Sequence, residues 1–172
     1  SDNVERVEKV RFWATQARDP ARHYQHSELG YNYRMSNVLA GIGRGQLKVL
    51  DERIAKKKYI FEYYKRELAN LEGIQFMPVN DWNEPNYWLS CILLKGAVRP
   101  LDVILALEKE NIESRPLWKP MHMQPIFKKY DYVGSHVAED LFENGICLPS
   151  DTKMTDDDLE RVTKIIKGLW SK

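Results

Sequence analysis

Apolar side chains recur every three or four residues in two stretches near the start of the chain, which predicts two helices. The first runs from about residue 2 to residue 17, and Ser1 and Asp2 can cap its start. The second is a long helix over residues 36–71, capped by Ser36 or Asn37. Its apolar face consists of Leu39, Ile42, Leu50, Ile54, Phe61, Tyr64, Leu68 and Leu71.

The segment between these helices, residues 18–35, has no sustained period and contains Pro20 and Gly30, so we expect a long irregular loop. A loop of this length in a compact domain is usually functional or disordered. Its aromatic content argues against disorder. A loop that leads into a helix start is also a natural place to hold an anion.

After Gly73 the pattern changes to short strands that alternate with short helices. The runs "GIQFMPV", "YWLSCILLK", "IESRPL" and "ICLPS" predict strands, while "RPLDVILALEKENI", "VGSHVAEDLFENG" and "MTDDDLERVTKIIKGLW" predict helices. Thr155 and Asp158 resemble a capping box at the start of the last helix. The order of elements predicts an α+β fold with a small mixed sheet and helices on one side of it.

Composition narrows the function classes. The chain has 172 residues, 43% hydrophobic and 30% charged, and a net charge of +1, which gives no general attraction to nucleic acid or membranes. No apolar run is long enough to span a bilayer. Cys91 and Cys147 lie in apolar, strand-like contexts, so we expect buried free thiols in a reducing compartment, although a disulfide stays open. We therefore expect a cytoplasmic protein.

Several motifs have ordinary explanations. The "GIGRG" stretch at residues 41–45 lacks the preceding strand of a dinucleotide fingerprint, so its glycines indicate close approach of another backbone. His23 and His26 have a spacing that a metal site could use, but no carboxylate or thiolate cluster completes it, and we predict no metal. The basic run "AKKKY" alternates with acidic residues on one helix and indicates a solvated face rather than a nucleic-acid site.

Residue chemistry alone does not decide whether two stretches bind a ligand or only stabilise a loop. Asn32 and Arg34, in "HSELGYNYRMS", offer the donors that a phosphate needs, yet either side chain could equally tie down a loop. The stretch "RPLWKPMHMQPIF", residues 115–127, has three prolines, a Trp and a His with little regular structure. It could be the stiff lip of a binding pocket or a loop that packs over the sheet.

Taken together, these stretches resemble the DegT/DnrJ/EryC1/StrS family of pyridoxal-phosphate-dependent sugar aminotransferases. The family pattern G-[YF]-N-x-R-[ML] is similar to "GYNYRM", and its "L-D-x-x-I-x-x-[RK]" stretch to "LDERIAKK". The segment "KPMHMQP" resembles the P-x-H-x-Q-P loop, and "GICLP" the closing G-[IL]-x-LP segment. The resemblance covers essentially the whole chain, with "GIGRGQ" in place of a more usual alanine-rich helix start.

The resemblance implies the C-terminal small domain of a fold-type I aminotransferase, with a long helix and a small, mostly antiparallel sheet. Residues 1–35 would continue from a pyridoxal-phosphate-binding domain, and residues 36–172 would form the small domain. The family's cofactor lysine lies on that other domain, upstream of residue 1. No residue of this chain is therefore expected to be catalytic, and we expect the isolated chain to be inactive.

The resemblance also implies roles for individual residues. Family members are homodimers with active sites at the subunit interface, where the motif asparagine, here Asn32, reaches the cofactor phosphate of the other subunit. Arg34, in the same motif, could support the cofactor phosphate or brace the loop, and bracing is favoured. Tyr24 is a weaker candidate for cofactor binding, through its hydroxyl. The residues expected near the nucleotide-sugar substrate are His122, Trp118 and Tyr31.

The wording "RPLWKPMH" is similar to members that aminate the 4-keto carbon of a UDP-4-keto-6-deoxy-N-acetylhexosamine, with glutamate as the amino donor, in bacillosamine-type glycan pathways. The alternative is a non-catalytic binding or assembly module on the same scaffold, which would have the same sequence features in this region.

Overall fold

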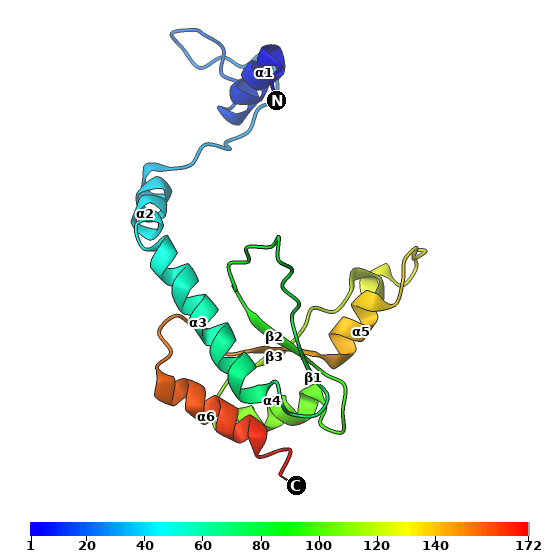
Figure 1. Ribbon diagram of the computed structural model, residues 1–172. Coiled ribbons are helices and arrows are strands. Elements are labelled where there is room, and N and C mark those ends of the chain that lie inside the picture. The colour runs from blue at the N-terminus through cyan, green and yellow to red at the C-terminus, as the bar shows by residue number, and fades with distance from the viewer. Residues whose placement is uncertain (172) are drawn as a thin grey trace. The chain divides into compact units, whose positions relative to one another are not determined.

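The computed structural model describes residues 1–171. The chain divides into two compact units, Ser1–Val49 and Leu50–Lys172. In Figure 1 the first unit is coloured from blue to cyan and the second from cyan to red. The domain boundary that we predict at residue 36 concerns the longer protein and stays a prediction.

The first unit consists of two helices and the loop that joins them (Figure 1). Helix α1 spans Val4–Ala14 and begins at Asn3, whose side chain accepts a hydrogen bond from the backbone N–H of Arg6. Helix α2 spans Asn37–Leu47, and Ser36 caps its start, as predicted. Residues 18–35 contain no helix, which confirms the predicted irregular loop.

The predicted long helix over residues 36–71 is wrong in one respect. Helix α2 ends at Leu47, a two-residue turn follows, and helix α3 spans Leu50–Leu68. The three glycines of α2 explain the early end, since each lowers helix stability by about 1 kcal/mol relative to alanine. Their expected close approach to another backbone is not made within residues 1–171: no heavy atom beyond their own helix lies within 4 Å of a Cβ built at Gly41, Gly43 or Gly45.

The second unit is built on a four-stranded sheet with the order β1-β2-β4-β3. The strands are β1 (Ile74–Phe76), β2 (Ser90–Leu94), β3 (Arg115–Pro116) and β4 (Gly145–Leu148). All three strand pairings among the described residues are antiparallel, so the sheet is not mixed. The central strand β4 is buried along its whole length.

Three helices cover one face of this sheet. These are α3, α4 (Pro100–Glu108) and α6 (Asp156–Lys167), and the segment between β3 and β4 adds η1 (Met121–Met123), η2 (Pro125–Phe127) and α5 (Val137–Asn144). The core that they enclose contains Ile60, Tyr64, Leu68, Ile74, Ile92, Leu94, Val103, Leu107, Ile146, Leu148, Leu159, Val162 and Ile166. The predicted α+β fold, with helices on the core face of a small antiparallel sheet, is confirmed.

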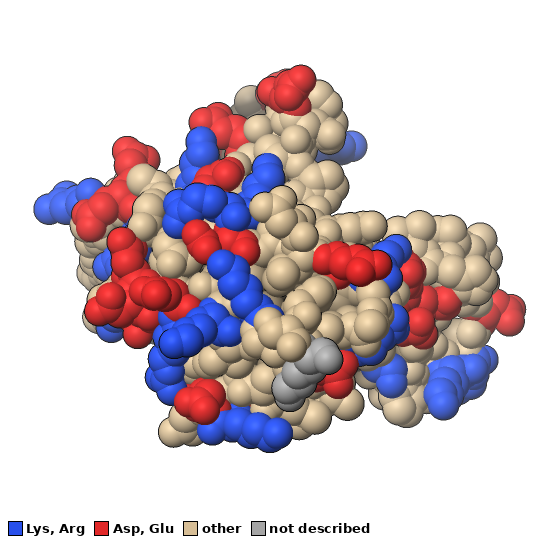
Figure 2. Space-filling model, turned by 60° about the horizontal axis from the view of Figure 1, so that its bottom comes forward, with Lys and Arg blue, Asp and Glu red and all other residues tan. Residues whose placement is uncertain are grey.

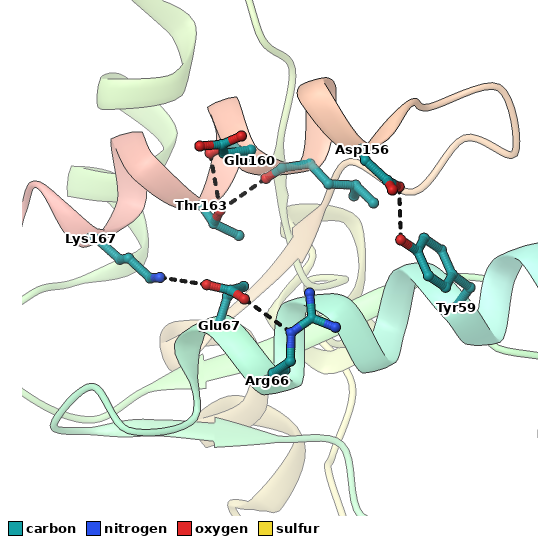
Figure 3. A network of polar contacts seen from close by, with 8 residues as sticks. Tyr59, Arg66, Glu67, Asp156, Glu160, Thr163 and Lys167 are labelled. Carbon is teal, nitrogen blue, oxygen red and sulfur yellow. Dashed lines mark hydrogen bonds and ion pairs between the residues drawn. The ribbon is translucent and has the colours of Figure 1, made fainter.

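Polar side chains fasten α6 to α3 at both ends of their contact (Figure 3). Tyr59 donates to Asp156 at 2.8 Å, and Lys167 donates to Glu67 at 2.7 Å. The predicted capping box forms at the start of α6, where Thr155 and Asp158 bond each other's backbone N–H groups. Helix α6 is thus held in register over the core.

No helix among residues 1–171 combines the length and the apolar character needed to cross a membrane.

Candidate functional site

The backbone of the "GYNYRM" segment runs beside the end of α1 in the first unit. The N–H of Tyr31 donates to the carbonyl of Trp13 at 2.8 Å, and the N–H of Gln16 donates back to Tyr31 at 2.9 Å. A single antiparallel bridge joins Thr15 to Asn32 at this point. These bonds fix the main chain of the segment, so its side chains need not brace it.

Gly30 is required where this segment crosses the turn after α1. A Cβ at Gly30 would lie 2.2 Å from the backbone carbon of Gln16 and 2.3 Å from the nitrogen of Ala17. Real Cβ atoms do not approach backbone this closely, so any other residue would push the segment away. The glycine of the motif therefore has a steric role next to Tyr31 and Asn32.

Side-chain bonds hold the preceding part of the loop. Asp19 accepts from Ser27 at 2.8 Å and from Gln25 at 3.1 Å, and the Ser27 bond is the main reason that the pKa of Asp19 is lowered. Glu28 pairs with Lys9 and accepts from the indole N–H of Trp13 at 2.9 Å. Hydrogen bonds within the loop thereby fix its shape, and the bonds of Glu28 attach it to α1.

The four candidate residues of the first unit all lie on this loop with exposed side chains. Asn32 and Arg34 are exposed, and Tyr31 is 51% exposed, its ring tilted against Tyr33 at a centroid distance of 5.6 Å. Tyr24 is 76% exposed and lies under the guanidinium of Arg18 at 4.4 Å, where a cation–π contact occupies its face. Donors for an anion are thus presented on a fixed main chain.

In the second unit, a cavity of about 600 Å³ opens beside the ends of β2, β3 and β4. Trp88 and Trp118, each 65% exposed, form part of its wall with ring centroids 6.2 Å apart. Lys57 and Cys147 also line it, as does Arg115, whose guanidinium pairs with Glu113 at 2.6 Å. The cavity therefore combines two large aromatic surfaces with both cationic and acidic side chains, the latter Glu113 and Asp151.

Lys57 is directed into the protein rather than toward solvent, so the solvated-face interpretation is wrong for this residue. Its ammonium donates to the carbonyl oxygens of Trp88, at 3.0 Å, and of Ser150. Burial is the main cause of the lowered pKa of Lys57. The ammonium ties α3 to the segments that follow β4 and precede β2.

His122 and Trp118, which we expect together near a substrate, line different hollows of the second unit. His122 lies in a smaller one with Tyr130 and Tyr132. Its ring stacks on Tyr132 at 3.7 Å, and its Nε2–H donates to Glu139 at 2.8 Å. Its described contacts thus tie the 118–136 segment to α5.

The two histidines considered above as metal ligands, His23 and His26, have hydrogen-bond partners on the same loop or next to it. His26 donates through Nδ1 to the carbonyl of Gln16 at 2.8 Å, while His23 bonds Gln25 at 3.2 Å. Among residues 1–171 no group of three or more His, Cys, Asp or Glu side chains is arranged to hold a metal. On the face shown in Figure 2, Lys and Arg side chains are intermixed with Asp and Glu.

Sequence reasoning did not single out Lys57, Trp88 or Arg115 as residues of one cavity. Lys57 belongs to a family pattern and to the basic run that predicts a solvated face, and its inward direction depends on carbonyl groups that the chain supplies about 30 and 90 positions later. Arg115 opens the "RPLW" stretch, so its neighbour Trp118 was the one available signal. Trp88 carries no distinguishing pattern.

Comparisons with known proteins agree with this picture. The profile of the DegT/DnrJ/EryC1/StrS aminotransferase family matches residues 1–167. The chain is 49% identical, over 99% of its length, to the putative pyridoxal phosphate-dependent aminotransferase EpsN of Bacillus subtilis (strain 168), of which it covers 45%. It is 31% identical, over 87% of its length, to the GDP-perosamine synthase of Escherichia coli O157:H7, of which it covers 40%.

A solved structure shows the same fold. The putative sugar aminotransferase Spr1654 from Streptococcus pneumoniae, in its PMP form, superposes with a TM-score of 0.85 at 21% identity, over 99% of this chain and 46% of that one. The chain thus spans less than half the length of the relatives it matches. The family and fold class inferred from the sequence are both confirmed, and the chain belongs to the DegT/DnrJ/EryC1/StrS aminotransferase family.

Proposed function

We propose that the protein containing this chain is a pyridoxal-phosphate-dependent aminotransferase that moves an amino group from glutamate to the 4-keto carbon of a nucleotide-linked 4-keto-6-deoxy sugar. The observation that carries the proposal is the 49% identity, over 99% of the chain, to a protein named as a pyridoxal phosphate-dependent aminotransferase. The matched region extends over both units.

The names of other relatives support the class of sugar. Matches include a UDP-4-amino-4,6-dideoxy-N-acetyl-beta-L-altrosamine transaminase of Campylobacter jejuni and a dTDP-4-amino-4,6-dideoxy-D-glucose transaminase of Escherichia coli. These names share a 4-amino-4,6-dideoxy hexose but differ in the nucleotide. We propose the UDP-linked N-acetylhexosamine as substrate, for glycan synthesis in the cytoplasm.

The residues of the first unit fit the cofactor's phosphate. Pyridoxal phosphate supplies the electron-withdrawing ring that amino-group transfer needs. Asn32 contributes an exposed amide and Arg34 an exposed guanidinium, both suited to an anion, on a main chain fixed by the bridge to Thr15. Tyr24 offers a hydroxyl from the same loop. In a homodimer these groups would reach the cofactor of the other subunit.

The residues of the second unit fit a different part of the reaction. Trp118 presents an exposed aromatic surface at the cavity, where a sugar or a base could pack. We propose that Trp118 contacts the nucleotide sugar, and that His122 positions the proline-rich loop that carries Trp118 through its hydrogen bond to Glu139. Tyr31 is a second proposed contact of the nucleotide sugar. We further propose that the lysine that binds the cofactor lies outside residues 1–172 and that these residues alone do not transaminate.

An assay of the full-length protein tests this proposal. It is incubated with pyridoxal phosphate, glutamate and a set of 4-keto-6-deoxy sugars linked to UDP, GDP or dTDP. We expect a 4-amino sugar and an equal amount of 2-oxoglutarate, fastest with the UDP-linked N-acetylhexosamine. Binding of the sugars without any transfer would instead favour the non-catalytic module.

A further inference from the structure

The two cysteines of the chain face each other across the central strands of the sheet. Cys91 on β2 and Cys147 on β4 are directly opposed in the antiparallel register, and their sulfur atoms lie 3.7 Å apart. Directly opposed residues of an antiparallel pair have Cα atoms about 4.5 to 5.5 Å apart, which falls inside the range of about 4.4 to 6.8 Å that disulfides occupy. The backbone is therefore already placed for a bond between them.

This pair lies on the sheet face opposite the helical core. Along β2, Ile92 and Leu94 belong to the core, so Cys91 between Ser90 and Ile92 points the other way. Cys147 lines the cavity, and Cys91 is partly exposed. Cys91 is thus the more exposed thiol, and Cys147, which is 9% exposed, is approached from the cavity rather than through the core.

A basic residue continues the same row. Arg115 on β3 pairs in register with Cys147, so Arg115, Cys147 and Cys91 follow one another across three strands. The hydrogen bond between the thiols lowers the pKa of Cys147, with the Cys91 S–H as donor to the thiolate, and the same bond raises the pKa of Cys91. Because Cys147 also lines the cavity and Cys91 does not, we assign Cys147 as the attacking thiolate and Cys91 as the resolving thiol.

We propose that Cys91 and Cys147 form a reversible disulfide when the protein meets an oxidised low-molecular-weight thiol. The Cys147 thiolate attacks one sulfur of the small disulfide, forms a mixed disulfide and releases the first thiolate. Cys91 then loses its proton and attacks the Cys147 sulfur, which releases the second thiolate. One small disulfide is reduced to two thiols, and the two cysteines are oxidised to one disulfide.

The disulfide would change the protein at a defined place. It would join β2 to β4, the two central strands, and close the chain from residue 91 to residue 147, which contains α4, β3 and α5. It would also convert a thiol in the wall of the cavity into part of a cross-link, next to the cavity residues Trp118 and Arg115. The modification site is therefore a redox-sensitive position within the candidate site.

Peptide mapping of the full-length protein tests the proposal directly. The folded protein is equilibrated with oxidised glutathione, free thiols are alkylated, and the protein is digested with trypsin. Cys91 and Cys147 lie on separate tryptic peptides, residues 67–95 and 130–153, each with a single cysteine. We expect these two peptides to appear joined after oxidation and to separate again after reduction with dithiothreitol.

Serine variants separate the roles of the two sulfurs. Cys91→Ser should stop at the mixed disulfide, so the 130–153 peptide should carry glutathione. Cys147→Ser, which removes the attacking thiolate, should leave residues 67–95 mostly unmodified over the same time. The wild-type map does not depend on how well these variants fold. If both peptides remain singly alkylated after full equilibration, or join only in denaturant or to other cysteines, the proposal is overturned.

Discussion

Different interactions hold the two units of the chain together. Within the described residues of the first unit, Ala17 is the one hydrophobic residue that is buried, and polar bonds such as those of Glu28 and Asp19 hold the loop. The second unit has a continuous core of thirteen apolar residues from three helices and three strands. The second unit therefore carries its own folding free energy, whereas the first does not bury enough apolar surface to do so.

The first unit instead exposes large apolar side chains at helical spacing. On α2, Val38 is 72% exposed, Leu39 and Ile42 are each 58% exposed and Leu47 is 69% exposed. Grouped apolar exposure of this kind marks a contact surface. We infer that the loop of residues 18–35 and helix α2 contact a protein surface outside the first unit. This agrees with the proposed role of Asn32 at a subunit interface.

The largest expected effect contrasts the two units by truncating one isoleucine in each. Ile166, in α6, is fully buried in the core, so Ile166→Ala should lower the free energy of unfolding by about 2 to 5 kcal/mol. The matched variant Ile42→Ala removes the same atoms from an exposed position and should change it by less than about 0.5 kcal/mol. Urea denaturation of the 172-residue chain measures both. Equal losses in the two variants would mean that the units do not differ in the way described.

The second prediction concerns the affinity for the cofactor. Asn32→Ala in the full-length protein should weaken pyridoxal phosphate binding by about 1 to 3 kcal/mol, because an amide donor to a charged phosphate is lost. That corresponds to a rise in Kd of roughly 5- to 150-fold. The unfolding midpoint of the cofactor-free protein should stay the same, since the Asn32 side chain is exposed. Cofactor titration followed by absorbance, with a denaturation curve beside it, measures both quantities.

Mixing subunits tests whether Asn32 acts across the dimer interface. Asn32→Ala subunits are combined with subunits that lack the cofactor lysine, so each parent dimer has no complete site. In the mixed dimer, the site with an intact lysine receives an intact Asn32 from its neighbour, and one active site per mixed dimer should result. Mixed dimers that form but regain no activity would show that Asn32 does not act in trans.

The sequence was most informative where a pattern is local. The capping box at Thr155 and Asp158 and the cap at Ser36 are both predicted from short stretches. The apolar face predicted for the long helix is confirmed in part: Tyr64 and Leu68 belong to the core, whereas Leu50 is 45% exposed. These features depend on the chemistry of neighbouring residues, which a sequence shows directly.

The cavity depends instead on groups that are distant in the sequence. The ammonium of Lys57 bonds carbonyl groups of Trp88 and Ser150, whose positions are set by the sheet and not by any local pattern. The opposition of Cys91 and Cys147 likewise requires the register of β2 on β4. Strand register is fixed by which side chains must enter the core, so it emerges only when the whole sheet is assembled.

A smaller effect should come from the capping box of α6. Thr155→Ala removes the oxygen that accepts the backbone N–H of Asp158 at 3.2 Å and should cost about 1 kcal/mol of unfolding free energy. Thr155→Ser keeps the oxygen and should cost much less. Urea denaturation of the two variants compares them. If Thr155→Ala has the same unfolding free energy as Thr155→Ser, then packing of α6 on α3, rather than the cap of α6, determines how α6 is held.

The smallest expected effect concerns two histidines that share one carboxylate in the second unit. Glu139 on α5 accepts hydrogen bonds from His136 and His122. The bond to Glu139 raises the pKa of His136, and the bonds from His136 and then His122 lower the pKa of Glu139. Protonated His136 and ionised Glu139 therefore stabilise the folded state together.

The sign of each shift fixes the pH window. Because the pKa of His136 is raised, its contribution is complete below its ordinary pKa of 6.5 and is lost as pH rises through the raised value. Because the pKa of Glu139 is lowered, its contribution is complete above 4.5 and is lost as pH falls through the lowered value. The stability difference between wild type and His136→Ala should thus be largest between these values and vanish in mild alkali.

Urea denaturation across this pH range, with His23→Ala as the matched control, measures the effect. His23 is an exposed histidine bonded to the amide of Gln25 rather than to a carboxylate, so its removal should leave no such window. Since the His136 side chain is 91% exposed, added salt should shrink the His136 difference by screening the pair. If the difference in unfolding free energy between wild type and His136→Ala is the same from pH 5 to pH 9, or does not change with salt, then His136 acts through packing and not through its charge.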